Sequence, residues 1–466
     1  MEIDEILKPF QRFGVHLGLE RIQKLLADLG NPHQSVPVIH VAGTNGKGSV
    51  CAYLSSVLTE TDYRVGRYTS PHLIDWNERI CLNEQPIPNE DLGELLLQIK
   101  AAIPEDCEDS PTQFETITAA AWLYFAQQQV DIAVMEVGLG GRLDATNVCS
   151  HPLVTIITSL SREHWQVLGP TLADIAREKA GILKPGCPAV IGQLPPEAKA
   201  VVEQRIKELG CPAVWVKPAV ELPPLAPPYQ GGKQDDLDLP DQEGEQEDLA
   251  SPYQRGEQEE NLALIKGKLQ NSWAVYAGIK YPLPLLGEIQ LSNSAIAIAT
   301  LQILRSQGWQ ISEEAIASGM AKTTWHGRLQ WTTWKNHRLL IDGAHNPAAA
   351  IALRQYVDTL HTPVTWVMGI LSTKDHADIF SALLQPSDRL YLVPVPDHSS
   401  ADPNALATLA QNTCPKLSHC STHPNLEAGL KAATANTFET SKQLIVLCGS
   451  LYLVGHFLKQ NGSTFA

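Results

Sequence analysis

The sequence predicts two α/β domains, each built on a mostly parallel sheet. Short apolar runs rich in β-branched residues alternate with helical stretches, as expected for strands that helices cover on both faces. A glycine-rich loop at residues 43–49 stands between one such run and a helix, and the alternation begins again after residue 338. These observations favour a P-loop-type domain with a mostly parallel sheet, followed by a smaller Rossmann-like α/β domain.

The first domain is expected to contain the glycine-rich loop and the elements around it. Each predicted strand is a short run of apolar residues, and each predicted helix carries apolar residues at helical spacing. In chain order these elements are a strand at residues 36–41, helices at 47–60 and 114–128, and strands at 132–137 and 153–157.

The second domain is expected to begin near Trp325. The run Trp325-His326-Gly327-Arg328 follows a helical segment and marks the predicted boundary, which gives domains at residues 1–324 and 325–466. The predicted elements beyond it are a strand at residues 339–341, a helix at 347–360, and strands at 363–368, 389–395 and 443–448.

One segment differs from the rest in composition. The 466-residue chain has a net charge of −16, and residues 233–260 alone hold eleven acidic and two basic residues. Such a segment buries too little apolar area to offset the entropy lost on ordering it. We expect a disordered acidic insertion at about residues 222–262; a tail that binds a basic partner is the alternative.

Composition also excludes several classes of protein. An acidic chain lacks the basic surface on which sequence-independent nucleic-acid binding depends. No run of eighteen apolar residues occurs, so we expect no membrane span, and residues 1–10 contain no secretory apolar region. Nine cysteines without CxxC pairs fit free thiols in the cytoplasm better than disulfides or a zinc site.

The loop Gly43-Thr44-Asn45-Gly46-Lys47-Gly48-Ser49 has the composition of a phosphate-binding turn. Glycines let backbone N–H groups turn toward phosphate oxygens, and the following helix directs its positive end at the same anion. Lys47 supplies a charge for the β and γ phosphates, and Ser49 a hydroxyl for Mg²⁺. The loop departs from G-x-x-x-x-G-K-[ST] because Gly48 separates the lysine from the serine. A glycine turn with a solvated lysine is the alternative.

Three further residues are candidates for chemistry. Glu136 lies at the end of the strand at 132–137, where a carboxylate at the carboxyl end of a parallel strand faces the ligand crevice. Taken alone it is as often structural or solvated, but the glycine-rich run at 137–147 strengthens the case. His164 and Lys179, each taken alone, are more often structural or solvated than functional.

Together these motifs resemble the folylpolyglutamate synthase/dihydrofolate synthase family, a branch of the Mur ligase superfamily. The resemblance covers nearly the whole chain, and the motifs occur in the family's order. The matching segments are residues 17–22, 43–49, 69–73, 77–80, 114–115, 136–147, 178–182, 342–347 and 448–452.

The resemblance implies a Mur ligase-like fold and a role for each matching residue. ATP would bind Gly43, Thr44, Asn45, Gly46, Lys47, Gly48 and Ser49, completed by Asn293, Arg328, Asp342 and His345. Mg²⁺ would bind Ser49, Ser70, Glu136 and His164, and folate would lie against Ser70, Pro71, His72, Leu73, Glu78, Arg79 and Phe114. Lys47, Lys179 and His164 would be catalytic, and residues 372–375 match a loop that lines the presumed glutamate pocket.

Lys179 matches a lysine that bacterial members of the family carry as a carbamate. A carbamate would turn a cation into an anion able to support a second magnesium ion, and its formation needs an uncharged amine. Two positions depart from the family pattern. Glu163 stands where aspartate is usual, and Ile289 stands where histidine is common, which puts an adenine contact in doubt.

The implied activity is that of an ATP-dependent ligase that adds L-glutamate to dihydropteroate and/or to the glutamate tail of tetrahydrofolate. ATP would convert a carboxylate to an acyl phosphate, which the amine of glutamate attacks. Because the first step joins two anions, neutralising their charge is the main demand. The expected partners are these small molecules, with no nucleic acid or membrane, and the family resemblance implies a monomer.

Three alternatives remain open at this point. The protein could have only one of the two activities, or it could be a cell-wall amide ligase of the Mur type. A non-catalytic ATP-binding regulator that uses the acidic insertion to hold a partner is the alternative from another class.

Overall fold

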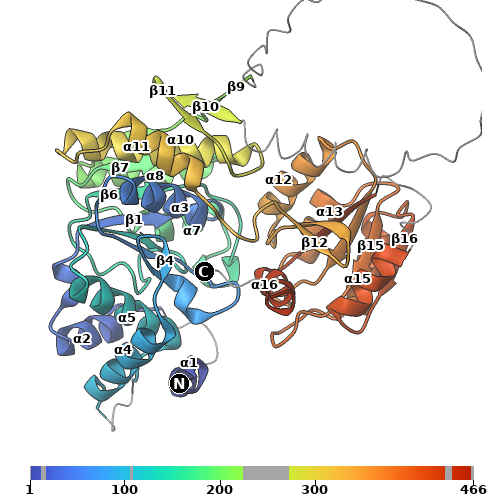
Figure 1. Ribbon diagram of the computed structural model, residues 1–466, viewed down its shortest axis with the longest axis horizontal. Helices are drawn as coiled ribbons and strands as arrows, with labels where there is room; N and C mark the ends of the chain where they lie inside the picture. Colours follow the sequence, from blue (N-terminus) through green and yellow to red (C-terminus); the bar gives the residue numbers. More distant parts are fainter. Residues whose placement is uncertain (1, 12–16, 105–108, 224–271, 436–442, 463–466) are drawn as a thin grey trace, which may run out of the picture.

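The computed structural model describes residues 2–11, 17–104, 109–223, 272–435 and 443–462. These residues form an eight-stranded, a three-stranded and a six-stranded sheet, with helices around them (Figure 1). The part up to Lys322, which contains the eight-stranded sheet, is the first lobe. The part from Gln330, which contains the six-stranded sheet, is the second lobe, and residues 323–329 are the linker between them.

The eight-stranded sheet has the strand order β4-β3-β2-β5-β1-β6-β7-β8. Neighbours from β2 to β8 pair in parallel, whereas β3 and β4 pair antiparallel at one edge. The strands are β1 (Val38–Ala42), β2 (Val65–Tyr68), β3 (Ile80–Leu82), β4 (Gln85–Pro86), β5 (Ile132–Glu136), β6 (Val154–Ile157), β7 (Ala189–Ile191) and β8 (Ala213–Trp215).

Helices cover both faces of this sheet, which explains why its central strands are apolar along their whole length. On one face, α3 (Lys47–Thr59), α10 (Ile289–Ser306) and α11 (Glu313–Lys322) pack on alternate residues such as Ile39 and Val41. The other face is covered by α2 (Glu20–Asp28), α4 (Asn89–Ala102), α5 (Gln113–Gln127), α7 (Leu172–Ala180) and α8 (Pro196–Leu209). Short helices α1 (Ile3–Leu7) and α6 (Trp165–Leu168) and 3₁₀ turns η1 (Lys8–Phe10), η2 (Pro32–Gln34) and η3 (Trp76–Arg79) complete the lobe.

A small antiparallel sheet lies at the outer side of α10 and α11 (Figure 1). Its strands are β9 (Val220–Leu222), β10 (Trp273–Tyr276) and β11 (Ile279–Pro282). The predicted acidic insertion at residues 222–262 lies outside the described residues except at 222–223. Leu222, the first residue of the predicted insertion, pairs with Trp273 as the last residue of β9.

The second lobe is a six-stranded sheet in the order β12-β13-β17-β14-β15-β16. Only β12 runs antiparallel to its neighbour. Its strands are β12 (Gln330–Trp334), β13 (His337–Ile341), β14 (Val364–Met368), β15 (Arg389–Leu392), β16 (His419–Thr422) and β17 (Leu444–Cys448). Helices α12 (Pro347–Asp358), α13 (His376–Leu383) and α14 (Pro403–Thr413) cover one face, and α15 (Leu426–Ala435) and α16 (Leu451–Gln460) the other.

The predicted fold class is confirmed, and every strand and helix predicted above overlaps an observed one. The sequence interpretation missed the antiparallel hairpin of β12 and β13, in which Gln330–Trp334 pairs with the predicted strand. None of the helices in the described part of the chain has the length and apolar run needed to span a bilayer.

Candidate active site

The carboxyl ends of the parallel strands in both lobes face one another, and the candidate residues follow those ends. In the first lobe they lie after β1, β2, β5 and β6, and in the second lobe after β13 and β14. The exceptions are Lys179 on α7, Asn293 on α10 and Arg328 in the linker. This is the position at which open α/β sheets bind ligands. A cavity of about 300 Å³ lies between these loops, and we call it the interlobe cavity. Among the predicted residues it is lined by Thr44–Ser49, Ser70, Glu136, His164, Lys179, Asn293, Arg328, Asp342 and His345.

The glycine-rich loop follows β1 and leads into the N-terminus of α3. Gly46 has φ +88°, a left-handed conformation that glycine adopts without steric cost, and it is the residue before the first helical turn. Lys47 Nζ lies 3.1 Å from the carbonyl oxygens of Gly43 and Thr44, so its ammonium donates back to the loop. These bonds from Lys47 to its own loop thus hold residues 43–47 in place.

Glu136 at the end of β5 is buried and lies beside this loop. Its Oε1 is 3.9 Å from Lys47 Nζ, and its Oε2 accepts a hydrogen bond from the backbone N–H of Ser70 at 3.2 Å. Burial raises the pKa of Glu136, although the Lys47 charge and the Ser70 N–H favour the ionised form. The strand end thus holds a buried carboxylate next to an ammonium group.

Lys179 near the end of α7 is buried beneath the same loop. Its Nζ donates to the carbonyl oxygen of Gly43 at 2.8 Å. Burial, reinforced by the nearby Lys47 charge, lowers the pKa of Lys179 to about 7. In a large fraction of the molecules, the Lys179 side chain is therefore an uncharged amine at neutral pH.

Glu163 accepts hydrogen bonds from three side chains of the second lobe. Its Oε1 lies 3.0 Å from His345 Nε2, 3.2 Å from Asn346 Nδ2 and 3.4 Å from Lys374 Nζ. Burial opposes ionisation of Glu163, but the hydrogen bond and charge of His345, with Lys374, outweigh it and hold its pKa well below the usual range. Glu163 is therefore a buried anion whose partners come from the opposite lobe.

His345 and Asn346 each have a second contact that fixes them. His345 Nδ1 lies 2.7 Å from the carbonyl oxygen of Gly343, so both ring nitrogens face acceptors and both donate only when the ring is protonated. The amides of Asn346 and Asn45 pair reciprocally at 3.0 and 3.2 Å. Asn346 also caps α12 by accepting from Ala349 N–H. The glycine-rich loop is thus joined directly to a helix start in the second lobe.

His164 is about half exposed, and its Nε2 lies 3.9 Å from Oε1 of Glu163. Partial burial lowers its pKa, although the Glu163 charge acts in the opposite direction. Its ring is neutral at pH 7 and keeps a nitrogen lone pair. In the described part of the chain, no three His, Cys, Asp or Glu side chains gather into a metal-binding group.

Asp342 at the end of β13 is used by the backbone around it. Its Oδ2 accepts from Leu329 N–H at 2.9 Å and its Oδ1 from Ala344 N–H at 2.8 Å. Burial raises the pKa of Asp342, although the charge of Arg328 acts in the opposite direction. Asp342 therefore shapes the linker and the His345 loop as well as lining the cavity.

Part of the lining of the interlobe cavity is apolar. Ile289 lines it and is 40% exposed, so the position that departs from the family pattern presents an aliphatic surface to the cavity. Nearby, Asn293 Nδ2 donates to Gln290 Oε1 at 3.0 Å, and Gln290 Nε2 lies 3.5 Å from Ser49 Oγ. Other apolar residues that line the cavity include Leu286, Ala348, Ala349, Ala352 and Leu353.

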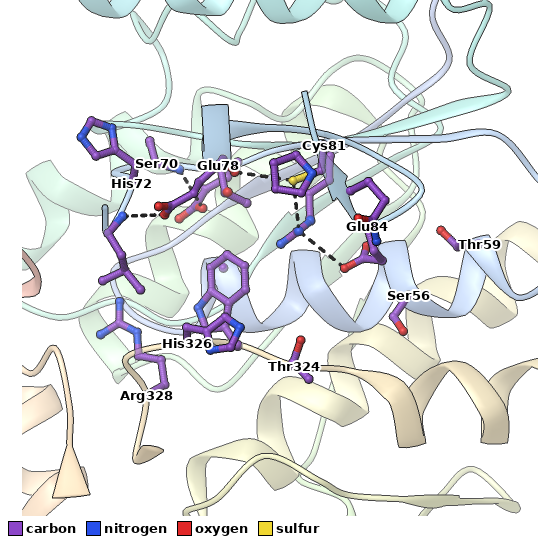
Figure 2. Close-up of a pocket in the computed structure, with 18 of the residues that line it drawn as sticks. Ser56, Thr59, Ser70, His72, Glu78, Cys81, Glu84, Thr324, His326 and Arg328 are labelled. Carbon is purple, nitrogen blue, oxygen red and sulfur yellow. Dashed lines mark hydrogen bonds and ion pairs between the residues drawn. The ribbon is translucent and has the colours of Figure 1, made fainter. Parts of the chain in front are cut away.

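The predicted folate-binding residues are divided between two further cavities. Arg79 and Phe114 line one of about 340 Å³, the Phe114 pocket, together with Gly138, Leu139, Lys374 and Tyr452. His72, Leu73 and Glu78 line another of about 410 Å³, the linker pocket. In Figure 2, His72, Glu78, Cys81 and Glu84 lie along one side of the linker pocket, and Thr324, His326 and Arg328 of the linker lie opposite.

The loop that carries these residues is held by Glu78. Its carboxylate accepts from the N–H groups of Leu73, Ile74 and Asp75 at 2.8–2.9 Å. Arg79 Nε donates to His72 Nδ1 at 3.0 Å, which requires that nitrogen to be unprotonated. Glu78 therefore supports the loop and has little hydrogen-bonding capacity left for a ligand.

All three cavities meet at Ser70, Pro71 and Leu451, which line each of them. The site thus offers three separate spaces that share one edge. A glycine-rich loop with a lysine, a buried carboxylate and a closing second lobe defines the class of nucleotide-dependent ligases with a Mur-type fold.

Comparison with known proteins agrees with this class. The family model described as Mur ligase middle domain matches residues 41–205, and the model described as dihydrofolate synthetase, C-terminal domain, matches residues 327–460. The chain is 33% identical to dihydrofolate synthetase of Saccharomyces cerevisiae, over 96% of this chain and 99% of that protein. It is 32% identical to dihydrofolate synthase/folylpolyglutamate synthase of Bacillus subtilis, over 96% of each.

The structure is also similar to that of folylpolyglutamate synthase of Mycobacterium tuberculosis, which was solved with ADP and AMPPCP. The TM-score is 0.79 with 28% identity, covering 99% of this chain and 98% of that one. The chain belongs to the folylpolyglutamate synthase/dihydrofolate synthase family and is an ATP-dependent ligase.

Three residues that make the polar contacts described above were not among the predicted site residues, and neither was Leu451, which lines all three cavities. Glu163 was noted only as a departure from the family pattern, and Asn346 and Gln290 had no assigned role. Each lies within three residues of a predicted site residue, which is the signal that could have found them. Their partners lie in distant parts of the chain, and no local pattern reveals such contacts.

Proposed function

We propose that this protein joins L-glutamate to dihydropteroate and to the glutamate tail of tetrahydrofolate, through an acyl phosphate, with release of ADP and phosphate. The observation that carries the proposal is the meeting of three cavities at Ser70, Pro71 and Leu451. The reaction requires a nucleotide, an acid and an amino acid to meet at one point. A site with three spaces and one common edge fits that requirement.

ATP occupies the interlobe cavity in this proposal. Backbone N–H groups of residues 43–49 and the positive end of α3 receive the phosphates, and Lys47 turns from its loop carbonyls to the β and γ phosphates. The apolar part of the lining around Ile289 takes the adenine by packing rather than by a polar contact. Asn293, Arg328, Asp342 and His345 complete the cavity from α10, the linker and the second lobe.

The acid substrate places its ring system in the Phe114 pocket and its carboxylate near Ser70. The pocket lining is mostly apolar, with Arg79 at its wall, which suits a flat aromatic molecule. Of the predicted folate residues, Ser70, Pro71, Arg79 and Phe114 contact the substrate in this proposal. His72, Leu73 and Glu78 hold the loop that carries them.

Mg²⁺ is the metal that the donor set fits. Mg²⁺ keeps several waters and takes one or two carboxylates together with substrate phosphates, whereas zinc sites are built from several Cys, His or carboxylate ligands. Glu136 supplies one buried carboxylate, Ser49 and Ser70 supply hydroxyls, and the neutral ring of His164 supplies a nitrogen. When bound, the ion would neutralise charge on the phosphates; Glu136 alone already places a fixed anion beside Lys47.

Lys179 is proposed to carry a carbamate. A carbamate forms only on an uncharged amine, and burial gives Lys179 a pKa of about 7. The same burial keeps water from the modified group. We also keep the predicted domain boundary at residues 324/325 and the predicted monomer as parts of this proposal.

The second lobe excludes water in this mechanism. An acyl phosphate is hydrolysed if water reaches it, so the amine must attack in a closed site. The bonds from His345, Asn346 and Lys374 to Glu163 hold the lobes closed around the three reactants.

The experiment that tests the proposal supplies each acid separately. Purified protein with ATP, Mg²⁺ and L-glutamate is assayed for ADP release and for a new amide product, first with dihydropteroate and then with tetrahydrofolate. Product from both acids supports the bifunctional assignment, and product from only one reduces it to a single activity. ADP release that does not depend on either acid would contradict the proposal.

A further inference from the structure

Gly48 separates Lys47 from Ser49, and its backbone does not require glycine. It lies in the first turn of α3 with an ordinary helical conformation, unlike Gly46, whose φ is +88°. Glycine weakens a helix relative to alanine because it loses more conformational freedom on folding. A reason other than backbone conformation must therefore account for glycine at this position.

The indole of Trp325 fills the space where a side chain would be. A Cβ built on Gly48 would lie 2.4 Å from Cζ2, 2.8 Å from Cε2 and 3.0 Å from Nε1 of Trp325. These contacts are far inside van der Waals distance, and they involve the fused ring rather than the end of a flexible chain. Gly48 is thus the surface on which a linker residue packs.

Trp325 has a second contact that ties it to the sheet. The guanidinium of Arg67 on β2 lies 5.2 Å from the indole centroid, within range of a cation–π interaction. Arg67 is buried and is itself held by Cys81 Sγ at 3.3 Å and by Glu84 at 3.5 Å. Figure 2 shows Cys81 and Glu84 across the linker pocket from the linker residues. The indole therefore rests on two parts of the first lobe.

Trp325 and Gly48 both line the interlobe cavity and the linker pocket. Their contact forms part of the wall between the two spaces. Trp325 also belongs to the linker between the lobes, so any movement of the second lobe relative to the first acts on this contact.

We propose that Trp325 is a positioning residue for ATP: its indole packs on Gly48 and fixes the orientation of Lys47 and Ser49 on either side. This rests on the proposed function, in which residues 43–49 hold the phosphates. Gly48, which separates Lys47 from Ser49, then provides a packing surface for the linker rather than a contact for the nucleotide. The interaction links the position of the lobes to the geometry of the phosphate site.

A double-mutant cycle separates this role from direct contact with phosphate. Gly48→Ala, Trp325→Ala and the double variant are compared with the wild type for binding of AMPPCP with Mg²⁺ by calorimetry, and for KM for ATP against kcat. Because the three atoms nearest to the added methyl all belong to the indole, we expect Gly48→Ala to weaken binding about tenfold or more in the wild-type background. In the Trp325→Ala background the same change should cost about twofold or less.

A second variant and a control test whether the loss of binding comes instead from unfolding or from a general disturbance of the loop. Trp325→Phe keeps a smaller ring at the same position, so the cost of Gly48→Ala should fall between the values in the other two backgrounds. Gly46→Ala is strained by its backbone, so its cost should be the same whether or not Trp325 is present. Thermal unfolding of every variant shows whether the fold is kept.

An equal cost of Gly48→Ala in all three backgrounds would overturn the proposal, because the glycine would then serve the nucleotide directly. Wild-type protein that binds no AMPPCP would instead contradict the proposed function. The two failures are thus distinguishable.

Discussion

The loops of the two lobes face the same cavity with different chemistry. In the first lobe, Lys47 and Glu136 interact with each other and with the backbone of their own lobe. In the second lobe, His345, Asn346 and Lys374 converge on a single first-lobe carboxylate, that of Glu163. The first-lobe part of the site is therefore held by contacts within its own lobe, whereas the second-lobe part is held by contacts between the lobes.

This difference assigns separate tasks to the two lobes. In the proposed reaction the first lobe supplies the loop, the lysine and the carboxylate that stabilise charge in the transition state. In the same proposal, the contacts of the second lobe to Glu163 exclude water from the reactants. Variants in the first lobe should therefore lower activity most, and variants at the lobe contact should act through closure.

Lys47→Ala should have the largest effect. Removing the ammonium that neutralises the phosphates should lower kcat about 10³-fold, with unfolding temperature close to that of the wild type. Steady-state ADP release and thermal unfolding measure the two. Near-normal turnover would remove Lys47 from the phosphate site.

Glu136→Gln should raise the magnesium requirement with little change in shape. We expect the Mg²⁺ concentration for half-maximal activity to rise about 10- to 100-fold, because a buried ligand is lost. A magnesium titration at saturating ATP measures this. If the titration curve coincides with that of the wild type, Glu136 is not a metal ligand.

Glu163→Gln tests the contacts that the second lobe makes with the first. It keeps the shape but removes the charge that His345 and Lys374 face, so we expect a loss in kcat/KM of about tenfold or more. Lys459→Gln is the matched control, because Lys459 also reaches across the lobes, to Asp75 at 3.5 Å, but both side chains are exposed. Equal losses in both variants would mean that Glu163 has no special role in closure.

Lys179→Met tests the buried amine through stability rather than activity. The folded-state pKa of about 7 lies below the ordinary value of 10.5, so between these values the unfolded chain binds a proton that the folded chain does not. The free energy of unfolding of the wild type should rise with pH across that window, by up to about 1.4 kcal/mol per pH unit, relative to the variant. Chemical denaturation in buffer free of carbon dioxide measures it, and parallel pH profiles would refute the lowered pKa.

The sequence predicted what local patterns determine. The strands at 36–41 and 132–137, the loop at 43–49 and the helix after it follow from apolar runs and glycines next to one another in the chain. The position of Glu136 beside the cavity follows from the rule that ligands bind at the carboxyl ends of parallel strands. Lys179, on a helix, and Asp342 were placed in the site by the family resemblance.

Contacts between distant segments could not be predicted in this way. The pairing of Asn45 with Asn346 joins residues 301 positions apart. The packing of Trp325 on Gly48 joins the linker to α3, the helix that follows the glycine-rich loop. The division of the predicted folate residues between two pockets also depends on how the loop at 70–79 folds around Glu78. These features arise from tertiary packing, for which a single sequence has no periodic signal.

The central claim is that a carboxylate of the acid substrate is phosphorylated in the cleft between the lobes before the amide forms. Isotope transfer tests it most directly. The acid is labelled with ¹⁸O in its reacting carboxylate, and the inorganic phosphate released during one turnover with ATP, Mg²⁺ and L-glutamate is analysed by mass spectrometry. An acyl phosphate predicts that one ¹⁸O atom appears in the phosphate for each amide formed, whereas amide formation with unlabelled phosphate would contradict the mechanism.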